Sequence, residues 1–248
     1  MTDPLQPLVD LPGVRDAADK ARDALAEVHR HRANRRGWPT TAAEAAVRAA
    51  RSSAAIDGGS IDIPADGRVE DPILAGSLRV GQALDGEALR TLAGVWQRAP
   101  LQALARLHLL AAADMVADPQ SLGRPRDVAG VAERLDLLAQ TVLTTNAPAP
   151  VVAAVVHGEL LTLRPFGTAD GIVARAAARL VAVSSGLDPH GLGVPEVFLL
   201  RRRQAYLDAV AAFGTGTPNA VGGWVIFHSG ALEDGAREAR SIADAASG

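Results

Sequence analysis

The sequence predicts an all-α protein, and three observations support this class. Alanine contributes 50 of the 248 residues, and alanine loses no side-chain entropy when a helix forms. Apolar residues recur at the three- and four-residue spacing of a single helix face. Strand patterns are scarce, because only Ile61 and Ile63 alternate with polar residues, so we expect at most a short β-hairpin there.

The first predicted element is an N-terminal helical segment over residues 1–63. Within it, Thr41 to Glu44 has the spacing of a capping box, and Pro39 stands just before it. This pattern predicts a helix from about residue 41 to about residue 56, which Gly58 and Gly59 then end.

A larger helical domain is predicted over residues 80–240, after a linker over residues 64–79 and before a tail over residues 241–248. Four apolar stripes predict its helices. Their members are Leu104, Leu107, Ala111 and Met115; Val128, Val131, Leu135, Leu138 and Val142; Val152, Val156, Leu160 and Leu163; and Leu199, Tyr206, Val210 and Phe213. Prolines and glycines separate the stripes, which indicates loops between the helices.

The composition excludes several kinds of chemistry. The chain has no cysteine, which excludes a thiol nucleophile, a disulfide and a cysteine-ligated metal. Lys20 is the only lysine and lies in a polar stretch, which argues against a phosphate-loop or Schiff-base lysine. The six histidines are scattered, and His29 and His31 point to different helix faces, so we expect no metal site.

Membrane and nucleic-acid partners are not expected either. A formal net charge of −3 gives no electrostatic basis for binding nucleic acid. The first residues, Met1 to Pro4, are acidic and broken by proline, which is not typical of a signal peptide. The apolar run Val151 to Val156 is too short to cross a bilayer. We therefore expect a cytoplasmic protein.

The stretch from Leu163 to Arg175 is the most informative about function. A helix is expected to end near Leu163 and another to begin near Gly171, with a tight loop of small residues between them. Such a loop directs free backbone N–H groups and the positive end of a helix dipole at one point, which is an anion-binding geometry. Arg175 lies one turn into the second helix and could reach an anion there. Asp170 offers an alternative, because an N-cap carboxylate can satisfy the same N–H groups.

This stretch resembles the signature of the Fic (Fido) family, whose members mostly transfer AMP from ATP to protein hydroxyls. The family's loop reads His-Pro-Phe-x-Asp/Glu-Gly-Asn-Gly-Arg-x-x-Arg, and it fits residues 164–175 without a gap. The matching residues are Pro165, Phe166, Gly171 and Arg175. The resemblance implies that an anion or nucleotide would be bound by Gly167, Ala169, Gly171 and Arg175.

Further landmarks of the family occur in the same order along the chain. They are Leu107 and His108; Gly123 and Arg126; His157, seven residues before the signature; Tyr206; and Gly223 to Phe227. The stretch Ser53 to Gly58 resembles the family's Ser-x-x-x-Glu-Gly inhibitory helix, with Asp57 in place of glutamate. The resemblance implies a Fic-type helical bundle and a contact between Asp57 and Arg175.

The departures from the family's pattern fall on the positions that carry the chemistry. Arg164 replaces the general-base histidine, and arginine stays protonated and cannot accept a proton. Thr168 replaces the acid that holds Mg²⁺ and is a weaker ligand for a hard cation. Asp170 replaces the asparagine that contacts the phosphates, and its negative charge would repel them. Ile172 replaces the first arginine, which clamps phosphate in the family.

Two functions therefore remain open. The four replacements favour a pseudoenzyme that has lost ordinary AMPylation, holds no cofactor and acts by binding or scaffolding an unidentified protein, with a homodimer left open. The alternative is an enzyme of changed chemistry, in which the loop binds a phosphorylated or other anionic substrate and Asp170 is the acid or base, or which keeps residual nucleotidyl transfer. Binding of Mg²⁺-ATP is the property that separates these readings.

Overall fold

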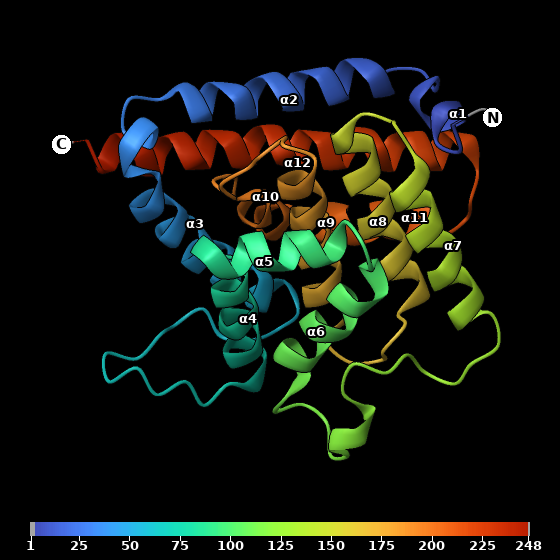
Figure 1. The fold of residues 1–248 in the computed structure, drawn as a ribbon, viewed down its shortest axis with the longest axis horizontal. Helices are drawn as coiled ribbons and strands as arrows, with labels where there is room; N and C mark the ends of the chain where they lie inside the picture. Colours follow the sequence, from blue (N-terminus) through green and yellow to red (C-terminus); the bar gives the residue numbers. More distant parts are fainter. Residues whose placement is uncertain (1–2, 248) are drawn as a thin grey trace.

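The computed structural model describes residues 3–247 of the chain. Within this range the regular structure is entirely helical, with helices α1 to α12, one short 3-10 turn and no strand (Figure 1). The predicted all-α class is therefore confirmed. The first two residues of the predicted N-terminal segment and the last residue of the predicted tail lie outside the described residues.

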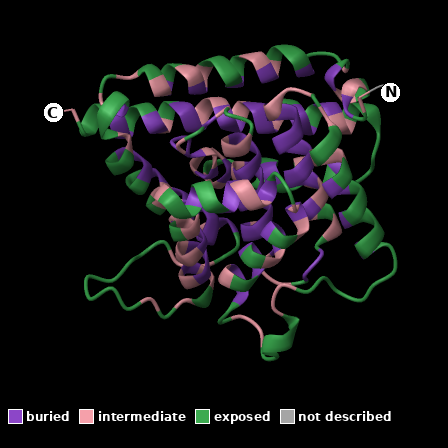
Figure 2. Ribbon diagram, viewed as in Figure 1, coloured by how far each residue is buried: buried purple, intermediate pink, exposed green. Residues whose placement is uncertain are grey.

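A buried helical hairpin forms the centre of the molecule. It consists of α8 (Ala149–Leu163) and α9 (Asp170–Ser184), joined by the loop over residues 164–169. Most residues of α8 from Pro150 to Leu160 are buried, because other helices cover it on nearly all sides (Figure 2). The indole Nε1 of Trp224 donates a hydrogen bond of 2.7 Å to the carbonyl oxygen of Ala154, which ties α8 to the C-terminal helix.

Two long helices lie along one edge of this hairpin. They are α12 (Pro218–Ala245) and α2 (Val14–Arg30), which follows the short α1 (Gln6–Val9). They run parallel and side by side (Figure 1), because Val14 lies beside Gly222 at one end and His31 Nε2 lies 3.1 Å from Asp244 Oδ1 at the other. The N-terminal helices thus pack along the C-terminal helix.

The remaining helices surround the hairpin on its other sides. They are α3 (Asn34–Ile56), α4 (Pro72–Ala83), α5 (Gly86–Trp96), α6 (Pro100–Ala112), α7 (Val131–Thr144), α10 (Pro195–Arg201) and α11 (Arg203–Phe213), with a 3-10 turn at Pro119–Ser121. Among them, α3 packs against α4, α10 and α12 and also reaches α9. This placement brings the end of α3 to the loop before α9.

The expected start of the helix over residues 41–56 is wrong. Helix α3 begins at Asn34 and continues through Pro39. Thr41 lies inside it, and its hydroxyl donates to Asn34 Oδ1 at 2.8 Å and to the carbonyl oxygen of Trp38 at 3.1 Å. A buried side-chain hydrogen bond therefore replaces the expected capping box.

Other local expectations also differ from the structure. Ile61 and Ile63 lie in an exposed loop and form no hairpin. Helix α4 begins at Pro72, within the expected linker, and Asp71 caps it by accepting from the backbone N–H of Leu74 at 2.8 Å. The stripe predicted from Leu199 to Phe213 is shared between α10 and α11, because the chain leaves helical geometry at Arg202.

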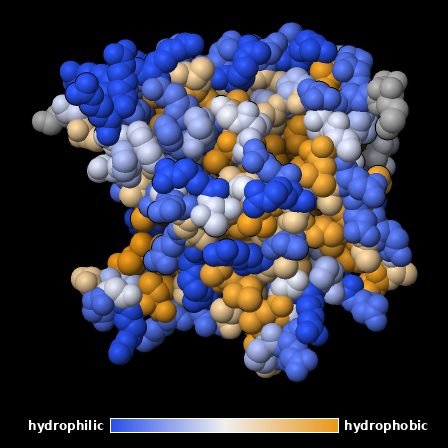
Figure 3. Space-filling view, in the orientation of Figure 1, coloured by the Kyte–Doolittle hydropathy of each residue, from blue (hydrophilic) through white to orange (hydrophobic). Residues whose placement is uncertain are grey.

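Over residues 3–247, every helix is too short or too polar to serve as a membrane span. Figure 3 shows hydrophilic side chains along the edge formed by α2, and hydrophobic side chains in scattered groups over the rest of this face.

The close crossing of α4 and α6 depends on Gly76. A β carbon at this residue would lie 2.0 Å from the carbonyl oxygen of Ala111, which belongs to the backbone of α6. Gly76→Ala should therefore push the helices apart and lower the free energy of unfolding by about 2–3 kcal/mol.

Gly223→Ala is the matched control, since nothing lies within 4 Å of a β carbon at that exposed position of α12. It should raise the free energy of unfolding by about 0.5–1 kcal/mol. Denaturant unfolding of both variants measures the difference, and equal stabilities would contradict this packing.

Candidate functional site

The loop between α8 and α9 has an unusual backbone. Three of its residues have positive φ angles, namely Arg164 at 48°, Gly167 at 79° and Ala169 at 51°. Glycine adopts this region freely, but other residues do so at a cost of about 1 kcal/mol. Contacts from the surrounding elements must therefore hold Arg164 and Ala169 in place.

The Asp170 carboxylate closes this loop from within. Its Oδ1 accepts the backbone N–H of Phe166 at 2.9 Å, and its Oδ2 accepts that of Gly167 at 2.8 Å. Asp170 is the first residue of α9, and Ala169 is the N-cap, which makes no side-chain cap. The carboxylate thus bonds N–H groups of the loop, as the alternative for Asp170 predicts, but Ala169 and not Asp170 is the N-cap.

The surroundings of Asp170 shift the pKa of its carboxyl in opposite directions. Burial raises the pKa of the Asp170 carboxyl above its ordinary value, and this effect outweighs the others. The N–H groups of Phe166 and Gly167 and the nearby charges of Arg164 and Arg126 act to lower the same pKa. Both oxygens are nevertheless occupied by donors of the loop itself.

Arg126 holds the loop from outside. Its backbone N–H donates to the carbonyl oxygen of Pro165 at 2.7 Å. Its guanidinium donates to the carbonyl oxygens of Arg164 at 2.8 Å and Leu163 at 3.1 Å, so a cation lies at the C-terminus of α8. A β carbon at Gly167 would lie 2.9 Å from Cδ of Arg126, so only glycine leaves room for this side chain.

His108 of α6 contacts the loop through Phe166 and Thr168. Its ring stacks on Phe166 with 4.2 Å between centroids. Its Nδ1 accepts the backbone N–H of Gly123 at 2.9 Å, which assigns the proton to Nε2, and Nε2 donates to Thr168 Oγ1 at 3.1 Å. Burial lowers the pKa of His108, which keeps the ring neutral. The hydroxyl of Thr168 is thus already engaged by the protein.

The end of α3 places a second carboxylate, that of Asp57, next to the loop. Gly58 has a φ of 89° and makes the left-handed turn that ends the helix. The N–H of Gly59 then donates to the carbonyl oxygen of Ala54, and that of Gly58 to Ala55, which is the Schellman pattern. Arg203 Nε donates to the carbonyl oxygen of Ile56 at 2.8 Å. These contacts fix Asp57 at the tip of α3.

Arg175 binds this end of α3 through hydrogen bonds. Its guanidinium is buried and donates from Nε to Ser53 Oγ at 2.9 Å, and from Nη2 to the carbonyl oxygen of Ser53 at 3.0 Å and to Asp57 Oδ2 at 2.7 Å. Burial is the largest single effect and lowers the pKa of Arg175, but the charges and hydrogen bonds of Asp57 and Tyr206 together outweigh it and raise that pKa above its ordinary value.

Asp57 also faces the first turn of α9. A β carbon at Gly171 would lie only 2.6 Å from Asp57 Oδ2. The carboxylate therefore lies where an anion attracted by the helix N-terminus would be expected. Asp57 and Asp170 together occupy the loop and the helix start with the chain's own negative charge.

The structure brings most of the predicted site residues together and separates two of them. Those that meet at the loop and the tip of α3 are Ser53, Asp57, Gly58, Gly167, Thr168, Ala169, Asp170, Gly171 and Arg175. The side chain of Arg164 is exposed and makes no hydrogen bond or ion pair with any described residue. Ile172 is only 2% exposed and packs in the core, so this position cannot present a side chain to a ligand.

The sequence does not reveal the roles of three residues that shape the site. His108 and Arg126 were noted as landmarks, but nothing in their spacing indicates that they bond Thr168 and the end of α8. Arg203 belongs to a run of three arginines that is typical of a solvated face, yet it bonds the end of α3. Among residues 3–247, no three His, Asp or Glu side chains are placed to hold a metal ion, and His29 is bonded to Asp188 at 2.9 Å.

Comparison with known proteins supports the fold. No family model matches the sequence, and no curated protein matches it. Among solved structures, the chain is similar to "Fic-1 (aa134 - 508) from C. elegans", with a TM-score of 0.66 and 18% sequence identity over 92% of this chain and 71% of that chain. The fold is therefore Fic-like, as the sequence predicts.

Removing the Asp57 carboxylate should destabilise the protein. Asp57→Ala leaves a buried guanidinium without its anion, and since the Asp57 side chain is 27% exposed, we expect a loss of about 2 kcal/mol. Glu159→Ala is the matched control, because it breaks the more exposed pair with Arg134 and should cost under about 1 kcal/mol. Thermal unfolding of both variants tests the pair, and an unchanged Asp57→Ala protein would contradict its structural role.

The neutral state of His108 predicts a pH dependence. Burial lowers its pKa in the folded state, so below about pH 6.5 the unfolded chain binds more protons and stability is lost as the pH falls. His108→Leu does not titrate, so its unfolding free energy should change less between about pH 7.5 and about pH 5 than that of the natural protein. Denaturant unfolding at both pH values measures this, and equal changes in the two proteins would refute the assignment.

Proposed function

We propose that this chain is a Fic-fold pseudoenzyme that does not transfer AMP and acts by binding or scaffolding another protein. The hydrogen bonds of the Asp170 carboxylate to the N–H groups of Phe166 and Gly167 carry this proposal. Those N–H groups belong to the loop that the resemblance implies as an anion site, and the carboxylate of Asp170 already occupies them.

The neighbouring residues support the same conclusion. Arg164 stands at the position of the family's general base and cannot accept a proton, and loss of a general base alone costs about 10²–10⁴-fold in rate. Thr168 is neutral and bonded to His108. Ile172 is buried in the core. The positions of the general base, the metal ligand and the first phosphate clamp thus hold an arginine, a threonine and a buried isoleucine.

The contact between Asp57 and Arg175 supports the proposal independently. Arg175 is the arginine that the resemblance implies as an anion contact, and its Nε and Nη2 are bonded to α3. In this protein the pair ties α3 to the core. We propose that its role is structural, since the Asp170 carboxylate already bonds two N–H groups of the loop beside it.

One observation favours the alternative of changed chemistry. The raised pKa of Asp170 is a property of many groups that transfer protons. An enzyme acting on a phosphorylated or other anionic substrate, or one with residual nucleotidyl transfer, would use this carboxyl together with Arg164. Both carboxylate oxygens are bonded to the loop, however, and a substrate would have to displace them.

The same proposal extends to the location, cofactors and partners of the protein. We propose that it works in the cytoplasm without a bound cofactor and that its ligand is a protein. A second copy of the chain is one candidate for that ligand. Nucleic acid and membrane are not expected partners, and for nucleic acid the net charge of −3 supports this.

Calorimetry with Mg²⁺-ATP tests the proposal. The natural protein should bind no tighter than about 1 mM. A variant with Arg164→His, Thr168→Asp, Asp170→Asn and Asp57→Ala should bind at least about tenfold tighter, because like charges brought together cost several kcal/mol and about 1.4 kcal/mol is a factor of ten. Asp57→Ala alone is the control, since it leaves Asp170 in the loop. Ile172 is kept, because an arginine there would place a charge in the core.

Three outcomes would count against the proposal. Micromolar affinity of the natural protein for Mg²⁺-ATP would show that the loop is not filled in solution. Transfer of a labelled nucleotide by the natural protein would show an active enzyme, and loss of that turnover in Asp170→Asn would identify the alternative. Absence of binding in a folded four-residue variant would show that the loop does not correspond to the family's site.

A further inference from the structure

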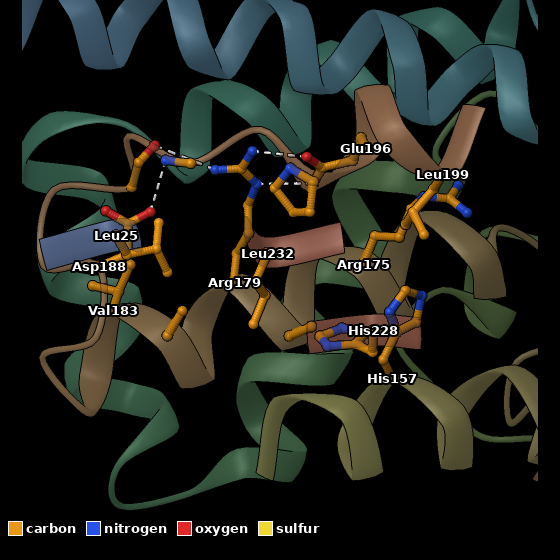
Figure 4. A pocket seen from close by; sticks show the side chains of 15 residues that line it. Leu25, His157, Arg175, Arg179, Val183, Asp188, Glu196, Leu199, His228 and Leu232 are labelled. Carbon is orange, nitrogen blue, oxygen red and sulfur yellow. Dashed lines mark hydrogen bonds and ion pairs between the residues drawn. The ribbon is translucent and has the colours of Figure 1, made fainter. Parts of the chain in front are cut away.

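A small cavity with a largely apolar wall lies inside the molecule, on the side of Arg175 away from α3. It has a volume of about 30 Å³ and lies between α8, α9, α10 and α12. In Figure 4 the rings of His157 and His228 lie next to each other near Arg175, and Arg179 and Glu196 lie in another part of the wall.

Three atoms in this wall lack hydrogen-bond partners. They are Nδ1 of His157, Nδ1 of His228 and Nη1 of Arg175. Their residues are 1%, 3% and 3% exposed, so bulk water does not reach them. Buried polar atoms in folded proteins are nearly always bonded to protein or to ordered water, so these three side chains favour a small hydrogen-bonding ligand in the cavity.

The two histidines cannot satisfy each other. His157 uses Nε2 for a bond of 2.8 Å to Tyr206 OH. The two rings meet edge to face at 82°, with 5.2 Å between centroids. Burial lowers the pKa of both rings, that of His228 to about 4, so both are neutral near pH 7. Each Nδ1 then offers one donor or one acceptor to the cavity.

The charged groups around the cavity already have partners within the protein. Arg179 donates to both oxygens of Glu196 at 2.9 and 2.8 Å. Asp188 lies 2.9 Å from His29 Nε2 and accepts the N–H groups of Leu192 and Gly193. Since these charges are paired, the cavity offers hydrogen bonds to its ligand and little net attraction for an ion.

A second cavity lies on the other face of Arg175. It also measures about 30 Å³ and lies between α3, α4 and α9, where small side chains such as Ala46 and Ala50 leave room. Ser77 Oγ in its wall is buried and has no partner. The same arginine thus borders two small cavities that each contain an unbonded polar atom.

We propose that ordered water fills both cavities and bonds Arg175 Nη1, the Nδ1 atoms of His157 and His228, and Ser77 Oγ. A water molecule needs about 10–15 Å³ of such volume and two to four polar partners. Each cavity therefore holds one or two water molecules. Water suits these sites because it can donate to one wall atom and accept from another.

This water completes the bonding of Arg175. Nε and Nη2 hold α3 through Ser53 and Asp57, and Nη1 reaches α8 and α12 through water. The buried solvent therefore links the end of α3 to the histidines of the core. It adds a binding site that is independent of nucleotide and of the loop.

A crystal structure of the full chain at about 1.5 Å tests the proposal. We expect a water peak within hydrogen-bonding distance of Arg175 Nη1 and of at least one of the two Nδ1 atoms. A second crystal under xenon pressure should show no xenon in either cavity, because xenon enters dry apolar cavities. Xenon density, or cavities without any density, would overturn the proposal.

A variant extends the test to the protein in solution. The ring protons of His157 and His228 should show nuclear Overhauser effects to bound water in the natural protein. His228→Phe fills the first cavity with an apolar ring and should abolish the effect at His157, while water beside Ser77 remains in its crystal structure. Absence of the effect in the natural protein, or its persistence at His157 in the variant, would contradict the assignment.

Discussion

A buried guanidinium must find acceptors, and this requirement determines how α3 meets the rest of the molecule. Arg175 is only 3% exposed, and the acceptors of its Nε and Nη2 all belong to α3. Helix α3 must therefore end where it does, with Asp57 at its tip. That carboxylate then lies against Gly171, at the N-terminus of α9, so one ion pair both secures α3 and places a negative charge at the start of α9.

The loop beside this pair keeps its shape although its chemistry is changed. Its left-handed residues are held by Asp170 from within, by Arg126 at the end of α8 and by His108 under Phe166. A carboxylate in an anion-binding loop would be repelled by a ligand phosphate, but it is a good partner for the loop's own N–H groups. Asp170 thus stabilises the loop by bonding its N–H groups, and this is the physical basis of the proposal that the protein is a pseudoenzyme.

Much of this could be predicted from the sequence, because local patterns determine it. The helical class follows from alanine and from apolar spacing, and the loop between α8 and α9 follows from its small residues. The contact of Asp57 with Arg175, implied by the resemblance, is present at 2.7 Å, while its role stays a prediction.

What could not be predicted depends on tertiary contacts. Thr41 has the spacing of a cap but bonds Asn34 inside a longer helix. The sequence offers Asp170 as an N-cap, but Ala169 is the N-cap, and the carboxylate of Asp170 instead bonds two N–H groups of the loop. Arg126 and Arg203 bond carbonyl oxygens at the ends of helices that are remote in sequence, and no local pattern reveals such partners.

We propose that the Asp170 carboxylate fills the loop between α8 and α9 by bonding its N–H groups. Amide nuclear magnetic resonance of the natural protein tests this most directly, because the N–H groups of Phe166 and Gly167 report on their acceptor. As Mg²⁺-ATP is added up to about 1 mM, the account predicts that both resonances stay in place, and that Asp170→Asn shifts them strongly without any ligand. Saturable movement of the Phe166 and Gly167 resonances with nucleotide in the natural protein would contradict it.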